Sequence, residues 1–153
     1  NFTMATSLLA SDREKGTYKS PLFHLFKLFS VNCRGNSIDT HVQCDTFNTE
    51  KFKGVPYLDV TSVYAREAKT VYVNVVNRHK EKSITADIFS NLGTFAGNAE
   101  TTLLTAASLE EPFSYDKREQ YIPAGKTIKP EGKKISVSFP AHSFTQIKIA
   151  LKP

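Results

Sequence analysis

The sequence has 153 residues, with 20 Lys and Arg against 15 Asp and Glu, and therefore a formal net charge of +5 at pH 7. Hydrophobic residues make up 40% and charged residues 23%, which is the composition of one globular domain and excludes a disordered chain. No apolar run reaches the ~18 residues of a membrane span, and two cysteines are too few for a disulfide scaffold. The longest basic run, Lys133-Lys134, is too short for a nucleic-acid-binding arm.

The first thirty residues are more apolar than a free N-terminus usually is. The first residue is Asn1 and the single methionine is Met4. We expect from these features a piece of a larger chain, and the alternative is that Met4 is an initiator behind a tag. Asn1-Phe2-Thr3 is the only N-x-S/T sequon, and no signal peptide is visible.

The first regular element that the pattern predicts is an α-helix over residues 21–30. Ser20 suits an N-cap and Pro21 the first helical position, while Asn32 and Gly35 offer a stop. The apolar positions recur at helical spacing, and they are Leu22, Leu25, Phe26 and Phe29, widened by Phe23 and Leu28. A helix this apolar must be covered on more than one side.

After Gly35 the hydrophobic period changes to two, which predicts strands. About seven or eight short strands are expected, and the clearest segments are residues 42–46, 58–65, 69–77, 83–90, 101–105, 135–139 and 145–151. Turn signals separate them, with no helix between strands. The predicted fold class is therefore mainly β: an antiparallel β-sandwich of jelly-roll or Greek-key type, preceded by one apolar helix.

The stretch from Ser108 to Lys134 is polar and longer than the other separators. Phe113, Tyr115 and Tyr121 are its apolar anchors. Such a segment is typical of a long crossing connection in a Greek-key or jelly-roll sandwich.

No motif in the sequence indicates an active site, a cofactor or a metal. Cys33 and Cys44 lie eleven apart, and we expect free thiols rather than a disulfide. The histidines lack the spacing of metal ligands, and they are His24, His41, His79 and His142. The patterns GxSxG, GxGxxG and the P-loop are absent. We therefore assign no catalytic, cofactor-binding or metal-binding residue and expect no cofactor.

The paired carboxylates and the exposed aromatic residues have ordinary structural explanations. We interpret the carboxylates of Glu110-Glu111 and of Asp116 with Glu119 as a solvated loop face. A basic and aromatic set on one sheet face would suit nucleic acid, but Tyr64, Arg66, Lys69 and Tyr72 are better explained as solvated edge residues. Sugar-stacking tyrosines are the more serious candidates, and these are Tyr57, Tyr64, Tyr72 and Tyr115. Substrate-binding residues stay unassigned.

Three segments in order along the chain resemble the C-terminal domain of family 51 α-L-arabinofuranosidases. They are Val55-Pro56-Tyr57-Leu58-Asp59-Val60, Val73-Asn74-Val75-Val76-Asn77-Arg78-His79 and Phe139-Pro140-Ala141-His142-Ser143-Phe144-Thr145. In that family a strand ends in a turn similar to Val-Asn-Arg-His, and a Pro-x-x-Ser-Phe-Thr-like corner introduces the last strand. The segment from Ser20 to Phe26 is similar to the family's last barrel helix. The resemblance extends from about Lys19 to Leu151.

The resemblance implies a catalytic (β/α)8 barrel followed by a jelly-roll-like sandwich. Residues 1–30 would be a remnant of the barrel's end, with its last helix at about 21–30, and residues 31–153 the C-terminal β-sandwich domain. The family performs retaining hydrolysis with two glutamates roughly 5 Å apart, both at barrel strand ends. The acid/base glutamate follows an asparagine in the family, and this chain has no Asn-Glu dipeptide. No catalytic residue is carried over, and we expect the chain alone to be inactive.

The leading hypothesis is a structural domain of an α-L-arabinofuranosidase that acts on arabinan and arabinoxylan, in a secreted or periplasmic parent. Its partners would be the catalytic barrel within the same protein, polysaccharide through that barrel, and possible further copies, but neither nucleic acid nor membrane. One alternative is a carbohydrate-binding module, and another is a protein-interaction sandwich unrelated to sugars. Asn77-Arg78-His79 is either a polar corner between domains or, as we favour, a plain turn.

Overall fold

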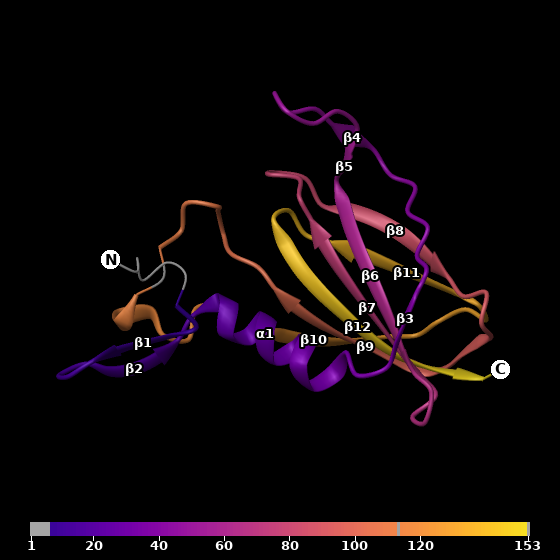
Figure 1. The fold of residues 1–153 in the computed structure, drawn as a ribbon, viewed down its shortest axis with the longest axis horizontal. Helices are drawn as coiled ribbons and strands as arrows, with labels where there is room; N and C mark the ends of the chain where they lie inside the picture. Colours follow the sequence, from indigo (N-terminus) through magenta and orange to yellow (C-terminus); the bar gives the residue numbers. More distant parts are fainter. Residues whose placement is uncertain (1–6, 113, 153) are drawn as a thin grey trace.

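The computed structural model describes residues 7–112 and 114–152 and confirms a mainly β, antiparallel fold (Figure 1). Six strands form one sheet in the order β10-β9-β12-β7-β6-β3, and β11 pairs with β8 in a separate sheet of two strands. The bounds are β3 Asn36–Ile38, β6 Leu58–Ala65, β7 Thr70–Asn77, β8 Ile84–Phe89, β9 Thr94–Leu104, β10 Ala124–Ile128, β11 Lys134–Phe139 and β12 Ser143–Lys152. Six of the predicted strand segments coincide with β6, β7, β8, β9, β11 and β12, whereas β3 and β10 were not predicted.

The two sheets share one apolar core. Ile147 on β12 is 0% exposed and Phe139 on β11 is 1% exposed. Because successive strand residues point to opposite faces, alternate residues of β7, β11 and β12 enter this core, and they are Val71, Val73, Val75, Ile135, Val137, Phe139, Ile147, Ile149 and Leu151. The intervening residues of β7 and β12 therefore lie on the outer face of the larger sheet.

The predicted helix is present as α1 (Pro21–Asn32), with Ser20 in an extended conformation at the N-cap. The amide of Cys33 donates to the Phe29 carbonyl oxygen and closes the last turn. The Phe29 ring lies 5.6 Å from the ring of Phe144, which precedes Gln146 on the outer face of the larger sheet. No residue of α1 is buried, although its apolar surface is wide.

Two short strands precede α1, and they were not among the predicted elements. β1 (Leu9–Asp12) pairs with β2 (Gly16–Lys19) in an antiparallel hairpin. Its turn is the charged segment 12–16, in which the Asp12 carboxylate accepts hydrogen bonds from the amides of Glu14 and Lys15. These two bonds hold the pKa of Asp12 below its usual value. The sequon at residues 1–3 lies outside the described residues, as do residues 1–6 of the predicted barrel remnant.

A second hairpin replaces most of the strand predicted at residues 42–46. Only β4 (Thr46–Phe47) is a strand there, and it pairs with β5 (Val55–Pro56). Figure 1 shows this hairpin extending away from the sandwich. Val42 and Cys44 pack against the core without joining a sheet, so their alternation reflects burial and not strand pairing.

The long polar segment predicted as a crossing connection, residues 108–134, leads from β9 in the larger sheet to β11 in the smaller one, but it contains a strand that was not predicted, β10, and the crossing is made after that strand. Residues 105–123, here called the long connection, link β9 to β10, which are neighbours in the same sheet. Residues 124–128 (AGKTI) lack a period-two pattern, yet they pair as an edge strand with β9. The described part of the long connection contains the 3-10 turn η2 (Tyr115–Lys117), and the predicted anchor Phe113 lies outside the described residues.

Candidate functional site

The structure brings together no catalytic constellation among residues 7–112 and 114–152. In that part of the chain no group of three or more His, Cys, Asp or Glu residues is placed to hold a metal ion. The Glu111 carboxylate accepts hydrogen bonds from the Ala107 amide, at 2.7 Å, and from the side chain of Gln120. Glu111 thus holds the long connection in shape, while Asp116 and Glu119 are exposed to solvent.

The candidate sugar-binding tyrosines are mostly covered by other side chains. The Tyr57 ring lies between Phe47 and His79, with centroid distances of 4.9 and 4.6 Å and interplanar angles of 32° for both pairs. Tyr64 packs against the core. Tyr115 meets the ring of Tyr18 edge-on at 4.7 Å. Because sugar stacking requires a free aromatic face, three of the four candidates are poorly placed for it; the fourth, Tyr72, is half-buried.

Two of the three segments that carry the family resemblance meet at a polar corner formed around Asn77, which is 1% exposed. Its Nδ2 lies within 3.0 Å of the carbonyl oxygens of Lys82, Phe139 and Pro140. Its Oδ1 accepts a hydrogen bond from the His79 amide at 2.9 Å. The corner therefore ties the end of β7 to the end of β11 and fixes the entry to β12.

His142 completes this corner from the turn before β12. Its amide donates to the His79 carbonyl oxygen at 2.9 Å, and its ring nitrogens face the carbonyl oxygens of Lys80 and Ala106 at 2.9 and 3.0 Å. Its φ of 38° is in the left-handed region, a conformation that costs energy for a residue with a side chain and is held here by these bonds.

A buried amide cluster attaches the end of α1 to the outer face of the larger sheet. Gln146 Nε2 donates to Asn74 Oδ1 at 2.8 Å, and the Asn32 side chain donates to Gln146 Oε1 at 2.5 Å. Asn74 Nδ2 also donates to the Cys33 sulfur at 3.3 Å. We call Asn32, Cys33, Asn74 and Gln146 the amide clamp. Its polar groups satisfy one another, so that α1 is fixed to the sandwich at its C-terminal end.

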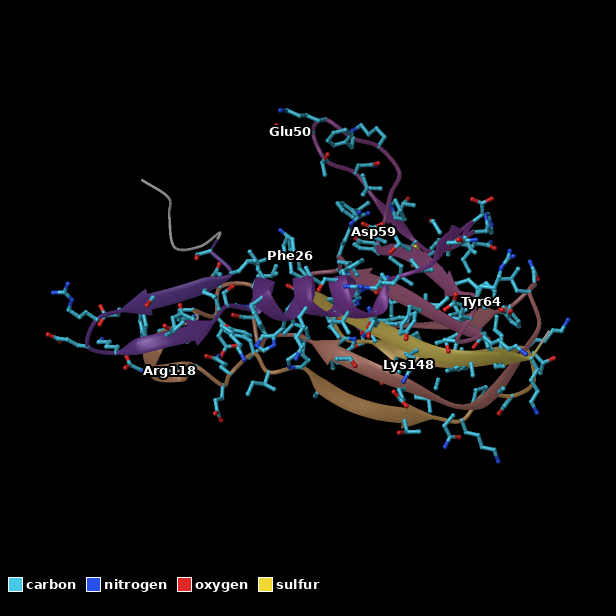
Figure 2. All side chains as sticks on the ribbon, turned by 60° about the horizontal axis from the view of Figure 1, so that its bottom comes forward. Phe26, Glu50, Asp59, Tyr64, Arg118 and Lys148 are labelled. Atoms are coloured by element: carbon cyan, nitrogen blue, oxygen red, sulfur yellow. The ribbon has the colours of Figure 1, made fainter. Side chains whose placement is uncertain are left out.

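Several large apolar side chains of α1 are open to solvent. Phe26 is 58% exposed and Val31 is 59% exposed, and Figure 2 shows Phe26 on the outward side of the helix. Leu9 on the hairpin is also exposed, at 49%. Soluble proteins rarely leave such a group of large apolar side chains uncovered unless it is an interaction surface. The exposed large apolar residues of the hairpin and helix are here called the α1 face, and they are Leu8, Leu9, Phe26, Phe29 and Val31; of these, Phe29 also contacts Phe144 of the sandwich.

A histidine, His24, lies on the same helix. Burial lowers the pKa of His24 on α1, and the positive charges of Lys19 and Lys27 lower it further. The neutral imidazole is therefore favoured at this position, as expected for a ring in apolar surroundings beside two cations.

The long connection contacts the N-terminal hairpin. The Arg118 guanidinium donates to the Lys15 carbonyl oxygen in the hairpin turn and, through Nε at 2.9 Å, to the Tyr115 carbonyl oxygen. Tyr115 in turn packs edge-on against Tyr18 of β2. Burial raises the pKa of Tyr115, with Asp12 and Tyr18 contributing. Figure 2 places Arg118 beside β1 and β2.

The amide clamp and the Arg118 contact were not predicted from the sequence. Asn32 and Gln146 are 114 positions apart, and Lys15 and Arg118 are 103 apart. No local pattern marks such pairs. The two free thiols, Cys33 and Cys44, were predicted correctly. In the described part of the chain no helix is long and apolar enough to cross a membrane.

Comparison with known proteins identifies the family. The model of the α-L-arabinofuranosidase C-terminal domain matches residues 3–143. An intracellular exo-α-(1→5)-L-arabinofuranosidase from Halalkalibacterium halodurans is 32% identical over 73 residues, which cover 46% of this chain and 15% of the relative. A similarly named protein from Bacillus subtilis is 30% identical over 71 residues, or 45% of this chain and 14% of that protein.

Solved structures show the same fold. An α-L-arabinofuranosidase from Thermotoga maritima, crystallised with arabinose, superposes with a TM-score of 0.81 at 22% identity, over 95% of this chain and 32% of its own. A family 51 α-L-arabinofuranosidase from Bifidobacterium longum superposes with a TM-score of 0.83 at 20% identity. The match covers 94% of this chain and 28% of that enzyme. The chain thus spans about a third or less of each solved relative. It belongs to the family of α-L-arabinofuranosidase C-terminal domains.

Proposed function

We propose that this chain is the non-catalytic β-sandwich domain of a glycoside hydrolase that removes terminal arabinofuranosyl groups from arabinan and arabinoxylan. The observation that carries the proposal is the combination of family membership over residues 3–143 with an apolar α1 face that the sandwich leaves exposed. In this proposal the chain supplies no catalytic group, and hydrolysis is performed by a catalytic barrel in the same protein.

The α1 face is the proposed contact with that barrel. Residues 1–30 would complete the barrel, with α1 as its last helix, and residues 31–153 would form the separate sandwich domain. A barrel helix is packed on one side by the barrel strands, which fits a helix none of whose residues is buried by the described part of this chain. The amide clamp holds the other side of α1 to the sandwich, so the helix would join the two domains rigidly.

Activity measurements test the proposal directly. The full-length gene product should hydrolyse 4-nitrophenyl α-L-arabinofuranoside, whereas residues 1–153 alone should not. The matched control is the full-length gene product with the two candidate barrel glutamates changed to glutamine, which should be as inactive as the isolated chain. Arabinose release by the isolated chain at an enzyme-like rate would contradict the proposal, and so would a full-length product without arabinofuranosidase activity.

A further inference from the structure

We propose that the long connection of the sandwich forms the outer edge of the substrate cleft and contacts the polysaccharide beyond the cleaved arabinofuranosyl group. This inference rests on the proposed function, because it requires α1 to be the last helix of the catalytic barrel. It goes further in giving the sandwich a part in substrate selection.

The N-terminal hairpin leads directly into α1. β2 ends at Lys19, and α1 begins at Pro21. In a (β/α)8 barrel, each segment that leads from a strand into the following helix lies at the face that carries the active site. With α1 as the last barrel helix, the hairpin β1–β2 stands on the catalytic face.

The long connection contacts this hairpin. Arg118 donates to the carbonyl oxygen of Lys15, and Tyr115 packs against Tyr18. Figure 1 shows the long connection running from the end of β9 to lie beside β1 and β2. Lys15 is in the turn of the hairpin, at the end away from α1. With the hairpin on the catalytic face, the contact places η2 beside that face, next to the end of the hairpin that is away from α1.

The long connection presents charged side chains of both signs to solvent. Residues 115–120 line a shallow, open pocket. Asp116, Lys117 and Glu119 are exposed there, and within the described chain their side chains make none of the hydrogen bonds or ion pairs that hold the loop together. Carboxylates accept and an ammonium group donates hydrogen bonds. Such a mixed set suits the hydroxyl groups of a neutral polysaccharide, which can do both.

The experiment compares two substrates in the full-length gene product. The double variant Lys117→Ala/Glu119→Ala removes polar groups without touching Arg118 or Tyr115. The matched control is Lys129→Ala/Glu131→Ala, which changes the same residue types at the same spacing on exposed positions between β10 and β11. The substrates are a linear α-(1→5)-linked arabino-oligosaccharide and 4-nitrophenyl α-L-arabinofuranoside, whose small leaving group does not reach the edge.

We expect the KM for the oligosaccharide to rise about threefold to tenfold in the Lys117/Glu119 variant, the loss of one or two hydrogen bonds made equally to ground and transition states. Its kcat and both constants for the nitrophenyl substrate should match those of the control. Equal KM changes for the two substrates, or none, would overturn the inference while the proposed function stands. A parent protein that hydrolyses neither substrate would overturn both. The single variant Lys117→Ala, with the same readout, serves if the double variant is unstable.

Discussion

The side-chain amide of Asn77 donates a hydrogen bond to the carbonyl oxygen of Phe139 at 3.0 Å, although the two residues are 62 positions apart. Asn77 ends β7 in the larger sheet and Phe139 ends β11 in the smaller one. One buried amide therefore links the two layers of the sandwich at the end of both strands. This explains structurally why the Asn77-Arg78-His79 and Phe139-Pro140-Ala141-His142 segments, which carry the family resemblance, occur together.

Asn77→Ala should lower the free energy of unfolding by about 2–3 kcal/mol, because it leaves buried carbonyl groups without a donor. Urea denaturation followed by circular dichroism measures this. The control is Asn98→Ala, at an exposed position, which should change stability by less than about 0.5 kcal/mol. A loss at position 77 no larger than that at position 98 would show that the polar corner does not stabilise the sandwich.

Gly35→Ala should destabilise the pairing of β3 with β6. A Cβ atom at this position would lie 2.3 Å from the carbonyl oxygen of Tyr64, which is backbone and cannot move aside. We expect the free energy of unfolding of this variant to fall by about 1–3 kcal/mol. Gly125→Ala is the control, because its nearest atom would be at 3.8 Å. Thermal unfolding of the two variants should differ clearly, and indistinguishable melting temperatures would refute the predicted clash.

Asn74 and Gln146 should prove energetically coupled through the amide clamp. In a double-mutant cycle with Asn74→Ala and Gln146→Ala, each single change leaves a buried amide unsatisfied, and the second change then costs less than it does alone. We expect a coupling energy of about 1 kcal/mol from urea denaturation. Strict additivity of the two changes would mean that the clamp does not act as a unit.

The stability of the isolated chain should fall as the pH drops from 7 to 5, in part through His24. The pKa of His24 is lowered in the folded protein, chiefly by burial, so near pH 6 the unfolded chain binds more protons than the folded one. The free energy of unfolding therefore rises with pH in this range. The stability contributed by neutral His24 is fully present above the unfolded pKa of about 6.5 and is lost as the pH falls toward the lower pKa of the folded state. His24→Gln should flatten this part of the profile relative to the unsubstituted chain. An unaltered slope in the His24 variant would contradict the assignment.

The sequence allowed prediction of the elements whose burial imposes a period. β6, β7, β11, β12 and α1 were placed to within a few residues because each carries an apolar stripe toward the core or the outer face. The sandwich class followed from them.

Elements without such a stripe were missed or misplaced. β10 is an edge strand of polar and small residues, so nothing in its pattern separates it from the long connection. The hairpin β1–β2 depends on its turn. There the Asp12 carboxylate accepts a hydrogen bond from the backbone amide of Glu14, and Gly16 adopts a φ of 77°. The amide clamp depends on contacts between distant residues, which no local signal reveals.

The central claim, that the α1 face packs on a catalytic barrel, is tested most directly by amide hydrogen exchange. The exchange of residues 21–32 should be compared between the isolated chain and the full-length gene product, with β12 as the internal reference. We predict that residues 22–29 exchange at least tenfold more slowly in the full-length product, because burial of a helix face suppresses local opening, while β12 exchanges equally in both. Equal exchange of the helix in the two proteins would contradict the account.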